Sequence, residues 1–194
     1  MNKYVIENVF PTPIYSTIIH NLYEVQDEID NKISGVKFTC PENWGKTHLL
    51  STTTFGDNII DDLNLVNTKN TIEEHLKVYC NEIEFQFKNY SMNSWFTLFE
   101  KNNYAHIHTH SYYDVSGCYY YQTNGDDGDI FFESPNLASS NSYCYTRKYG
   151  DRWRHKPKVG KLILFPSWLP HGVLTNETDS KRISLAFNIL FNRE

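Results

Sequence analysis

The chain of 194 residues is poor in glycine and proline, has few cysteines and lacks a long apolar run. Its 9 glycines and 7 prolines exclude the fibrous and linker-like classes of protein. Apolar runs are as short as Leu162–Phe165, whereas a membrane-spanning helix needs about 18–20 apolar residues, so no membrane partner is expected. The 4 cysteines form no Cys-x-x-Cys pair, and residues 1–4 show no apolar signal core. Reduced thiols and a cytoplasmic location are therefore expected.

Positive charge is also scarce. Lys and Arg total 18 against 23 Asp and Glu, which gives a formal net charge of −5. An acidic balance disfavours nucleic acid as the main partner. Hydrophobic residues make up 40% of the chain and aromatic residues 15%, which excludes wholesale disorder. The length predicts a single domain over residues 1–194, and no oligomeric state is predicted.

The hydrophobic period changes near residue 90. Before it, the prolines of segment 9–15 predict an extended edge segment, and residues 22–34 have the spacing of a short helix. A longer helix is expected from a Thr71 cap, with Glu74 as its capping-box partner, through Phe87. After residue 90 the period is two, which is typical of strands. The strands are expected at residues 94–100, 115–122, 129–133, 161–165 and 182–190.

These patterns predict an α+β fold. Residues 1–90 would supply the extended segment and helices packed outside, and residues 91–194 a β-sandwich or barrel core. Segment 134–158 shows no regular period, and a long loop without structure in a compact domain is usually a lid or an insert. We therefore expect a lid over the barrel here.

Histidine is concentrated in one part of the chain. Of the 8 histidines, His106, His108 and His110 stand at alternate positions, and His171 follows the apolar strand 161–165. Alternate residues of an extended chain point to one face, so two of these imidazoles and His171 could hold one metal ion. Such a facial site with open positions suits Fe(II) oxygen chemistry. The competing interpretation is a solvated edge strand; the other histidines, such as His48, are expected to be ordinary.

The last predicted strand has one apolar face and one polar face. Ile183, Leu185, Phe187 and Ile189 occupy the first, whereas Arg182, Ser184 and Asn188 occupy the second. A polar row in so apolar a strand faces either solvent or a polar cavity. Arg182 and Ser184 together could bind a carboxylate through a charged fork and a hydroxyl.

The chain resembles the Fe(II)/2-oxoglutarate-dependent oxygenase superfamily, and within it a small bacterial and phage group. The resemblance is carried by Phe10–Pro13, His108–His110, Ser116–Tyr120, Phe165–His171 and the strand from Arg182. It implies a double-stranded β-helix (jelly-roll, cupin-like) core in a bacterial or phage-infected cytoplasm. It also implies a hydroxylase that uses Fe(II), 2-oxoglutarate and O2 and releases succinate and CO2.

By position, the resemblance makes His108 and His171 iron ligands. It assigns Arg182, aided by Ser184, to the distal carboxylate of 2-oxoglutarate, and Tyr120 to a second contact with this cosubstrate. The chain departs from the superfamily at His110, where an acidic residue is usual. Three interpretations stay open: His110 as third ligand, which the spacing favours, a carboxylate from Asp114, or water. If His106 were the first ligand, His108 would be the second; otherwise His106 is expected to line the cavity or its mouth.

The substrate is expected to be a small molecule or a peptide. Segment 134–158 is rich in Arg and Lys interleaved with Tyr and Trp, so it could steer an anionic or peptide substrate. A cupin-type metal or ligand-binding protein is the main alternative, since His108, His110, Asp114 and His171 also approach cupin spacing. A three-histidine metal enzyme that does not use 2-oxoglutarate and a structural protein without metal are the others.

Overall fold

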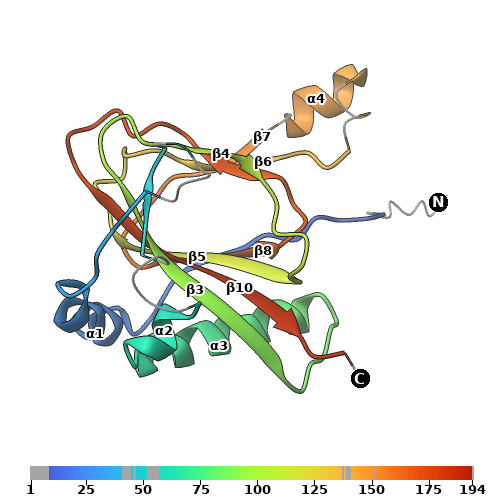
Figure 1. Ribbon diagram of the computed structural model, residues 1–194. Helices are drawn as coiled ribbons and strands as arrows, with labels where there is room; N and C mark the ends of the chain where they lie inside the picture. The colour runs from blue at the N-terminus through green and yellow to red at the C-terminus, as the bar shows by residue number, and fades with distance from the viewer. Residues whose placement is uncertain are drawn as a thin grey trace.

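Two antiparallel β-sheets face each other and form a double-stranded β-helix (Figure 1). The computed structural model describes residues 9–40, 45, 47–51, 57–136, 138, 141–150 and 152–193. The six-stranded sheet has the order β1 (Tyr15–Ile18), β8 (Lys161–Pro166), β5 (Val115–Gln122), β10 (Arg182–Phe191), β3 (Tyr90–Phe99) and β2 (Leu49–Leu50). The four-stranded sheet has the order β4 (Ala105–His108), β9 (His171–Val173), β6 (Ile130–Glu133) and β7 (Arg152–His155). The predicted fold class is thus confirmed.

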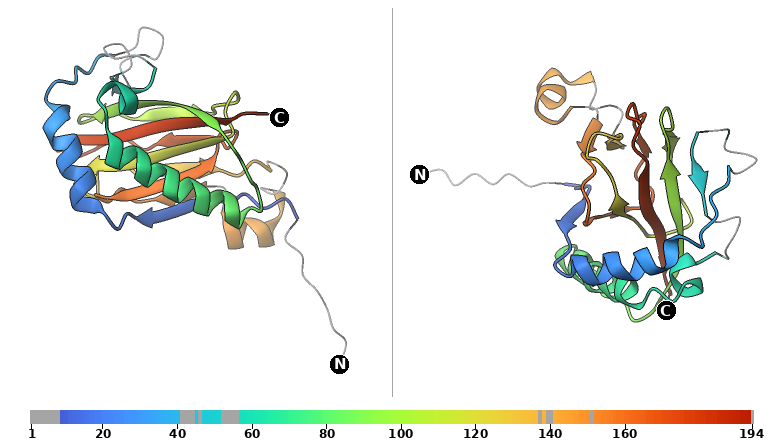
Figure 2. Two further views of the ribbon diagram at one scale, coloured as in Figure 1. Left: turned by 90° about the horizontal axis from the view of Figure 1, so that it is seen from below. Right: turned by 90° about the vertical axis from the view of Figure 1, so that its left-hand side faces the viewer.

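The N-terminal helices cover the outer face of the six-stranded sheet. They are α1 (Leu22–Ile33), α2 (Ile59–Asp62) and α3 (Val66–Glu82), and both views of Figure 2 show them on the side away from the four-stranded sheet. Strand β8 is apolar on both faces for this reason. Leu162 and Leu164 belong to the core beneath the helices, whereas Ile163 and Phe165 belong to the core between the sheets. None of the described helices has the length and apolar character needed to span a bilayer.

The long helix does not begin at the expected Thr71 cap. It begins at Val66, and Thr71 lies inside it, where its hydroxyl donates to the carbonyl of Asn67 at 2.7 Å. The cap comes from another helix: the Glu28 carboxylate of α1 accepts the backbone N–H groups of Asn67 and Thr68, both at 2.8 Å. A carboxylate at this position accepts hydrogen bonds from backbone amides that have no partner within the helix, and it interacts favourably with the positive end of the helix dipole. The helix also ends at Glu82 rather than Phe87.

Segment 134–158 is more regular than its composition predicts. It contains α4 (Tyr143–Tyr149) and the edge strand β7, which pairs with β6 from Ile130↔His155 to Glu133↔Arg152. Figure 1 shows α4 outside the barrel, next to β7. The expectation of a structureless loop is therefore wrong for these residues. The sequence pattern missed β7 because this strand is short and mixes charged with aromatic side chains, which gives no clear alternation. Its role as a lid stays a prediction.

Candidate metal and cosubstrate site

Three imidazoles meet inside the barrel. His108 ends β4 and His171 begins β9, and the two residues are register partners across these strands. His110 comes from the loop after β4, where its backbone N–H donates to the carbonyl of Ser167 at 2.8 Å. One ligand nitrogen of each histidine lies within 4.8 Å of the others. This spacing is suitable for three ligands of one metal ion.

A bulge in β4 separates His106 from this cluster. The pairing of β4 with β9 shifts between Ala105↔Val173 and His108↔His171, so one extra residue lies on β4. The inward face therefore passes from Ala105 to His108, and the His106 side chain is exposed. Strict alternation of side chains along the strand does not predict that His106 points outward. His106 contributes its backbone instead, since its carbonyl accepts a hydrogen bond from Nδ1 of His108 at 2.8 Å.

Backbone carbonyls orient two of the three rings. Nδ1 of His171 donates to the carbonyl of Leu169 at 2.9 Å, as Nδ1 of His108 does to His106. A carbonyl only accepts, so both rings carry their proton on Nδ1 and present the Nε2 lone pair to the cluster. This arrangement fixes tautomer and ring direction before a metal binds.

The protein environment keeps the cluster uncharged. Burial lowers the pKa of His108, and burial together with His108 lowers the pKa of His110 to about 4. Burial, followed by His108, lowers the pKa of His171 to about 3. Neutral imidazoles at pH 7 have free lone pairs, as metal binding requires. The donor set fits Fe(II), and equally other divalent metals that accept nitrogen ligands.

Asp114 does not join the three histidines. Its Oδ2 accepts the backbone N–H of Phe191 at 2.8 Å, and no carboxylate among the described residues belongs to the cluster. Its backbone carbonyl accepts the N–H of Ser167 at 3.1 Å. Asp114 thus ties the loop after β4 to β10 and to the turn before β9, which favours His110 over Asp114 as the third ligand.

Arg182 lies in the same cavity and is only 1% exposed. Its guanidinium lies 4.0 Å from the centre of the Phe99 ring and donates through Nη1 to the carbonyl of Gly128 at 2.6 Å. Among the described residues, its Nε is buried without a hydrogen-bond partner, and Arg182 forms no ion pair with a carboxylate. A buried cation without an anion is unfavourable, so this arrangement fits an anionic ligand.

Ser184 and Tyr120 lie beside Arg182, as register partners on β10 and β5. The Ser184 hydroxyl hydrogen-bonds to the hydroxyl of Thr97 at 2.7 Å, and Tyr120 is 1% exposed with its ring centre 5.9 Å from the guanidinium. Burial raises the pKa of the Tyr120 hydroxyl, which therefore stays a neutral hydrogen-bond donor. Both side chains line the cavity with Arg182.

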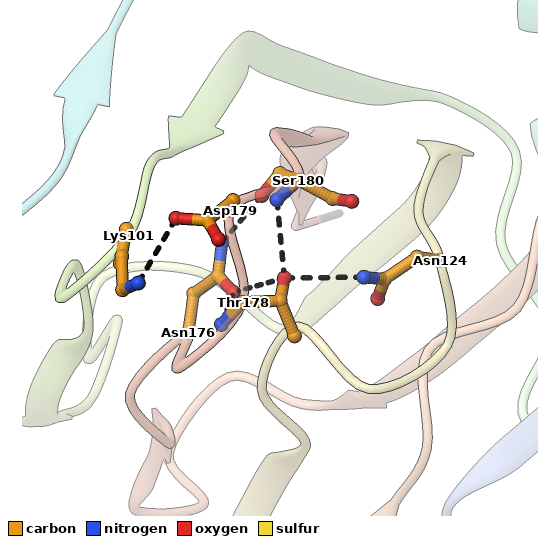
Figure 3. A network of polar contacts seen from close by, with 6 residues as sticks. All are labelled: Lys101, Asn124, Asn176, Thr178, Asp179 and Ser180. Atoms are coloured by element: carbon orange, nitrogen blue, oxygen red, sulfur yellow. Dashed lines mark hydrogen bonds and ion pairs between the residues drawn. The ribbon is translucent and has the colours of Figure 1, made fainter.

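Two turns hold Arg182 in place. Gly128 has φ +101°, and a Cβ there would lie 2.3 Å from the carbonyl oxygen of Leu174, so this turn accepts only glycine. The turn before β10 is fixed by buried Asn176, whose Oδ1 accepts the Thr178 amide at 2.9 Å and whose Nδ2 donates to the carbonyl of Ser180 at 2.7 Å (Figure 3). Asn124 reaches the Thr178 hydroxyl from the turn after β5, at 3.1 Å.

The cavity between the sheets measures about 410 Å³. Its lining contains residues that the sequence patterns did not single out as site residues, among them His48, Asn93 and Trp95. His48 was expected to be ordinary, yet its ring stacks on Phe99 with centres 4.9 Å apart. These residues come from β3 and from the segment before β2. The period-two pattern of β3 was a usable signal for Asn93 and Trp95, whereas no pattern marked His48.

Residues 93–188 match the family model described as "Putative 2OG-Fe(II) oxygenase". A prolyl-4-hydroxylase from Pseudomonas putida has a similar structure, with TM-score 0.63, 14% identity and 93% of each chain covered. HygX from Streptomyces hygroscopicus, solved with nickel and 2-oxoglutarate bound, has TM-score 0.65 and 11% identity over 93% of this chain and 84% of that one. No curated protein matches significantly by sequence. At these identities the likeness to solved structures concerns the fold.

Proposed function

We propose that this chain, whose residues 93–188 match the family model of the 2OG-Fe(II) oxygenases, hydroxylates an unactivated C–H bond of a small molecule or peptide. The observation that carries the proposal is one cavity lined both by the three histidines and by a buried Arg182 that pairs with none of the described carboxylates. The three histidines fit a metal ion, and the guanidinium of Arg182 fits an acidic cosubstrate.

His108, His110 and His171 would hold Fe(II). With 2-oxoglutarate and O2, bound iron would supply the oxidising chemistry that places one oxygen atom in the substrate C–H bond and the other in succinate, with release of CO2. The protein's contribution is placement. The carbonyls of His106 and Leu169 direct two imidazoles, and the amide of His110 anchors its loop to Ser167.

Arg182 would bind the distal carboxylate of 2-oxoglutarate, with Ser184 and Tyr120 as neighbouring hydroxyl groups. The planar guanidinium can meet a carboxylate with two parallel hydrogen bonds, and the pair is strong where water is excluded. The hydrogen bond to the carbonyl of Gly128 and the contact with Phe99 hold the guanidinium before the anion arrives. The enclosing sheets keep bulk water from the reacting groups.

The substrate would enter near segment 134–158. Its exposed cationic and aromatic side chains favour an anionic or peptide partner; among them are Arg147, Arg154, Lys158, Tyr143 and Trp153. The overall acidic charge of −5 disfavours nucleic acid. A small molecule or a peptide is therefore the substrate class that we propose.

Turnover of the cosubstrate tests this proposal without knowledge of the substrate. Iron-loaded protein in air is expected to convert 2-oxoglutarate slowly to succinate. His171→Ala should abolish the conversion, and His20→Ala, which changes an exposed histidine outside the cavity, should not. If the wild-type protein binds iron and forms no succinate above the level of free iron, the proposed function is wrong.

A second candidate is a three-histidine metal enzyme that does not use 2-oxoglutarate. The observation in its favour is His110, since the described cluster contains no carboxylate. This candidate predicts iron-dependent oxygen consumption that 2-oxoglutarate leaves unchanged. The oxygenase proposal predicts consumption that depends on 2-oxoglutarate, so an oxygen electrode separates the two.

A further inference from the structure

His110 differs from the other two candidate ligands in what holds its backbone. His108 lies in β4 and His171 in β9, and the pairing of these two strands fixes both residues. His110 lies in the loop between β4 and β5, outside regular structure. Its N–H donates to the carbonyl of Ser167 at 2.8 Å, and its carbonyl accepts the N–H of Tyr113 at 3.0 Å. The first of these bonds ties the loop to a distant part of the chain, so the position of His110 depends on Ser167.

Ser167 belongs to the turn between β8 and β9, and the same turn orients His171. Nδ1 of His171 donates to the carbonyl of Leu169, two residues after Ser167, at 2.9 Å. The turn is tight, since the N–H of Leu169 donates to the carbonyl of Pro166 at 3.0 Å. A shift of Ser167 would therefore move the anchor of the His110 backbone together with the anchor of the His171 ring.

Buried hydrogen bonds join Ser167 to the six-stranded sheet. Its Oγ lies 2.8 Å from Oγ of Ser116 in β5, and the Ser116 hydroxyl donates to Oδ1 of Asn188 in β10 at 2.7 Å. A hydroxyl has one proton, so Ser167 is the donor in the bond between the two serines. Ser116 and Asn188 are register partners, and all three residues are at most 2% exposed. These three side chains form a directed serine–asparagine network.

The network offers the loop a precision that strand pairing does not give it. His110 lies beyond the register pair His108↔His171 between β4 and β9. A functional constellation must be held to within about 0.5 Å of its working geometry. Buried polar groups need hydrogen bonds to offset the loss of water, and a network that is satisfied in this way fixes one arrangement of the groups that it joins.

We propose that the serine–asparagine network positions His110 as the third metal ligand. Asn188 and Ser116 hold the hydroxyl of Ser167, and the carbonyl of Ser167 holds the backbone of His110. The His110 ring is thereby placed with its centre 4.9 Å from that of His108. This inference rests on the three-histidine site of the proposed function and adds the residues that maintain its geometry. The competing interpretation is a network that stabilises the fold without acting on the site.

Co(II) reports on the site without turnover, because its visible absorption depends on the ligands and on their geometry. Metal-free protein is titrated with Co(II), and affinity and absorption band are both recorded. Ser116→Ala and Ser167→Ala each remove one hydroxyl of the network, and a double variant removes both. Ser94→Ala is the matched control. Ser94 of β3 is 0% exposed, and its hydroxyl donates to Asn58 and accepts the amide of Ile60 on the face covered by helices.

Each single variant should bind Co(II) about tenfold more weakly than the wild-type protein, with an altered band, because a group that supports a ligand is lost. The double variant should also lose about tenfold rather than about a hundredfold, since both hydroxyls act through the same bond. Ser116→Thr keeps the hydroxyl and should retain the wild-type affinity. Ser94→Ala should have a lower free energy of unfolding in urea, with unchanged affinity and band.

Wild-type affinity and an unchanged band in both serine variants would overturn the positioning role and leave the proposed function intact. Losses that multiply in the double variant would also overturn it, because the two serines would then act independently. Asn188→Ala leaves both serines in place and tests the same link if a serine variant does not fold. If the wild-type protein binds no Co(II), the three-histidine site of the proposed function fails, and this inference fails with it.

Discussion

His110 gives this site three neutral nitrogen ligands in place of two nitrogens and a carboxylate. A bound divalent ion would therefore keep its full charge, which favours an anionic cosubstrate beside it. The sequence left His110, Asp114 and water as alternatives for the third metal ligand, because spacing alone does not show in which direction a carboxylate in a loop points. The structure favours His110, since Asp114 is bonded to the amide of Phe191.

Substitutions at these two residues should have different effects. His110→Ala should weaken Fe(II) binding by more than about tenfold, because a ligand is lost. Asp114→Ala should leave metal affinity near the wild-type value and lower the free energy of unfolding by about 1–3 kcal/mol, since the Phe191 amide loses its acceptor. Metal titration and urea denaturation measure the two effects. Loss of iron binding in Asp114→Ala with His110→Ala unaffected would reverse the assignment.

His48 should make the fold sensitive to acid. Burial, followed by a smaller repulsion from His108, lowers its pKa to about 4. The unfolded chain, with a pKa of about 6.5, takes up the proton first, so the stability from neutral His48 is complete above that value. It is lost as the pH falls towards 4, by about 3 kcal/mol in all.

The variant His48→Phe keeps a ring stacked on Phe99 and removes this titration. Urea denaturation at about pH 7 and about pH 4.5 is the measurement. The wild-type protein should lose more stability between the two pH values than the variant does. Equal losses would show that His48 is not the titrating group.

At the scale of elements, the sequence predicted the positions of the strands better than it predicted how the strands pair. The alternation of β10 correctly separated the polar row of Arg182 and Ser184 from the core. The bulge in β4 could not be predicted, because it arises from pairing with β9 far along the chain. For the same reason the start of α3 was missed: its cap is Glu28 of another helix rather than a neighbour in sequence.

Removal of this cap should destabilise the protein without affecting the site. Glu28→Ala leaves the amides of Asn67 and Thr68 without their acceptor and is expected to lower the free energy of unfolding by about 1–2 kcal/mol. Glu24→Ala, an exposed acid in the first turn of α1, is the matched control and should change it less. Urea denaturation measures both variants. Equal effects would show that Glu28 is no cap.

At the scale of the whole molecule, the two sheets bring together residues that no local pattern joins. His108 and His171 meet across β4 and β9, and Arg182 comes from the opposite sheet. Alternation along the strands suggested the histidine site and the carboxylate site separately, and the family resemblance joined them in one assembly. His48, Asn93 and Trp95 were missed because they become part of the site only when β3 and the segment before β2 close the cavity.

The most direct test of the central claim is the visible absorption of the complex of Fe(II) and 2-oxoglutarate, recorded without oxygen. The wild-type protein should develop the weak charge-transfer band of the chelated 2-oxo acid. His171→Ala should lose the band, and Arg182→Ala should need at least about tenfold more 2-oxoglutarate, because a charged hydrogen-bonded pair is lost. Iron bound with no band at saturating 2-oxoglutarate would contradict the account.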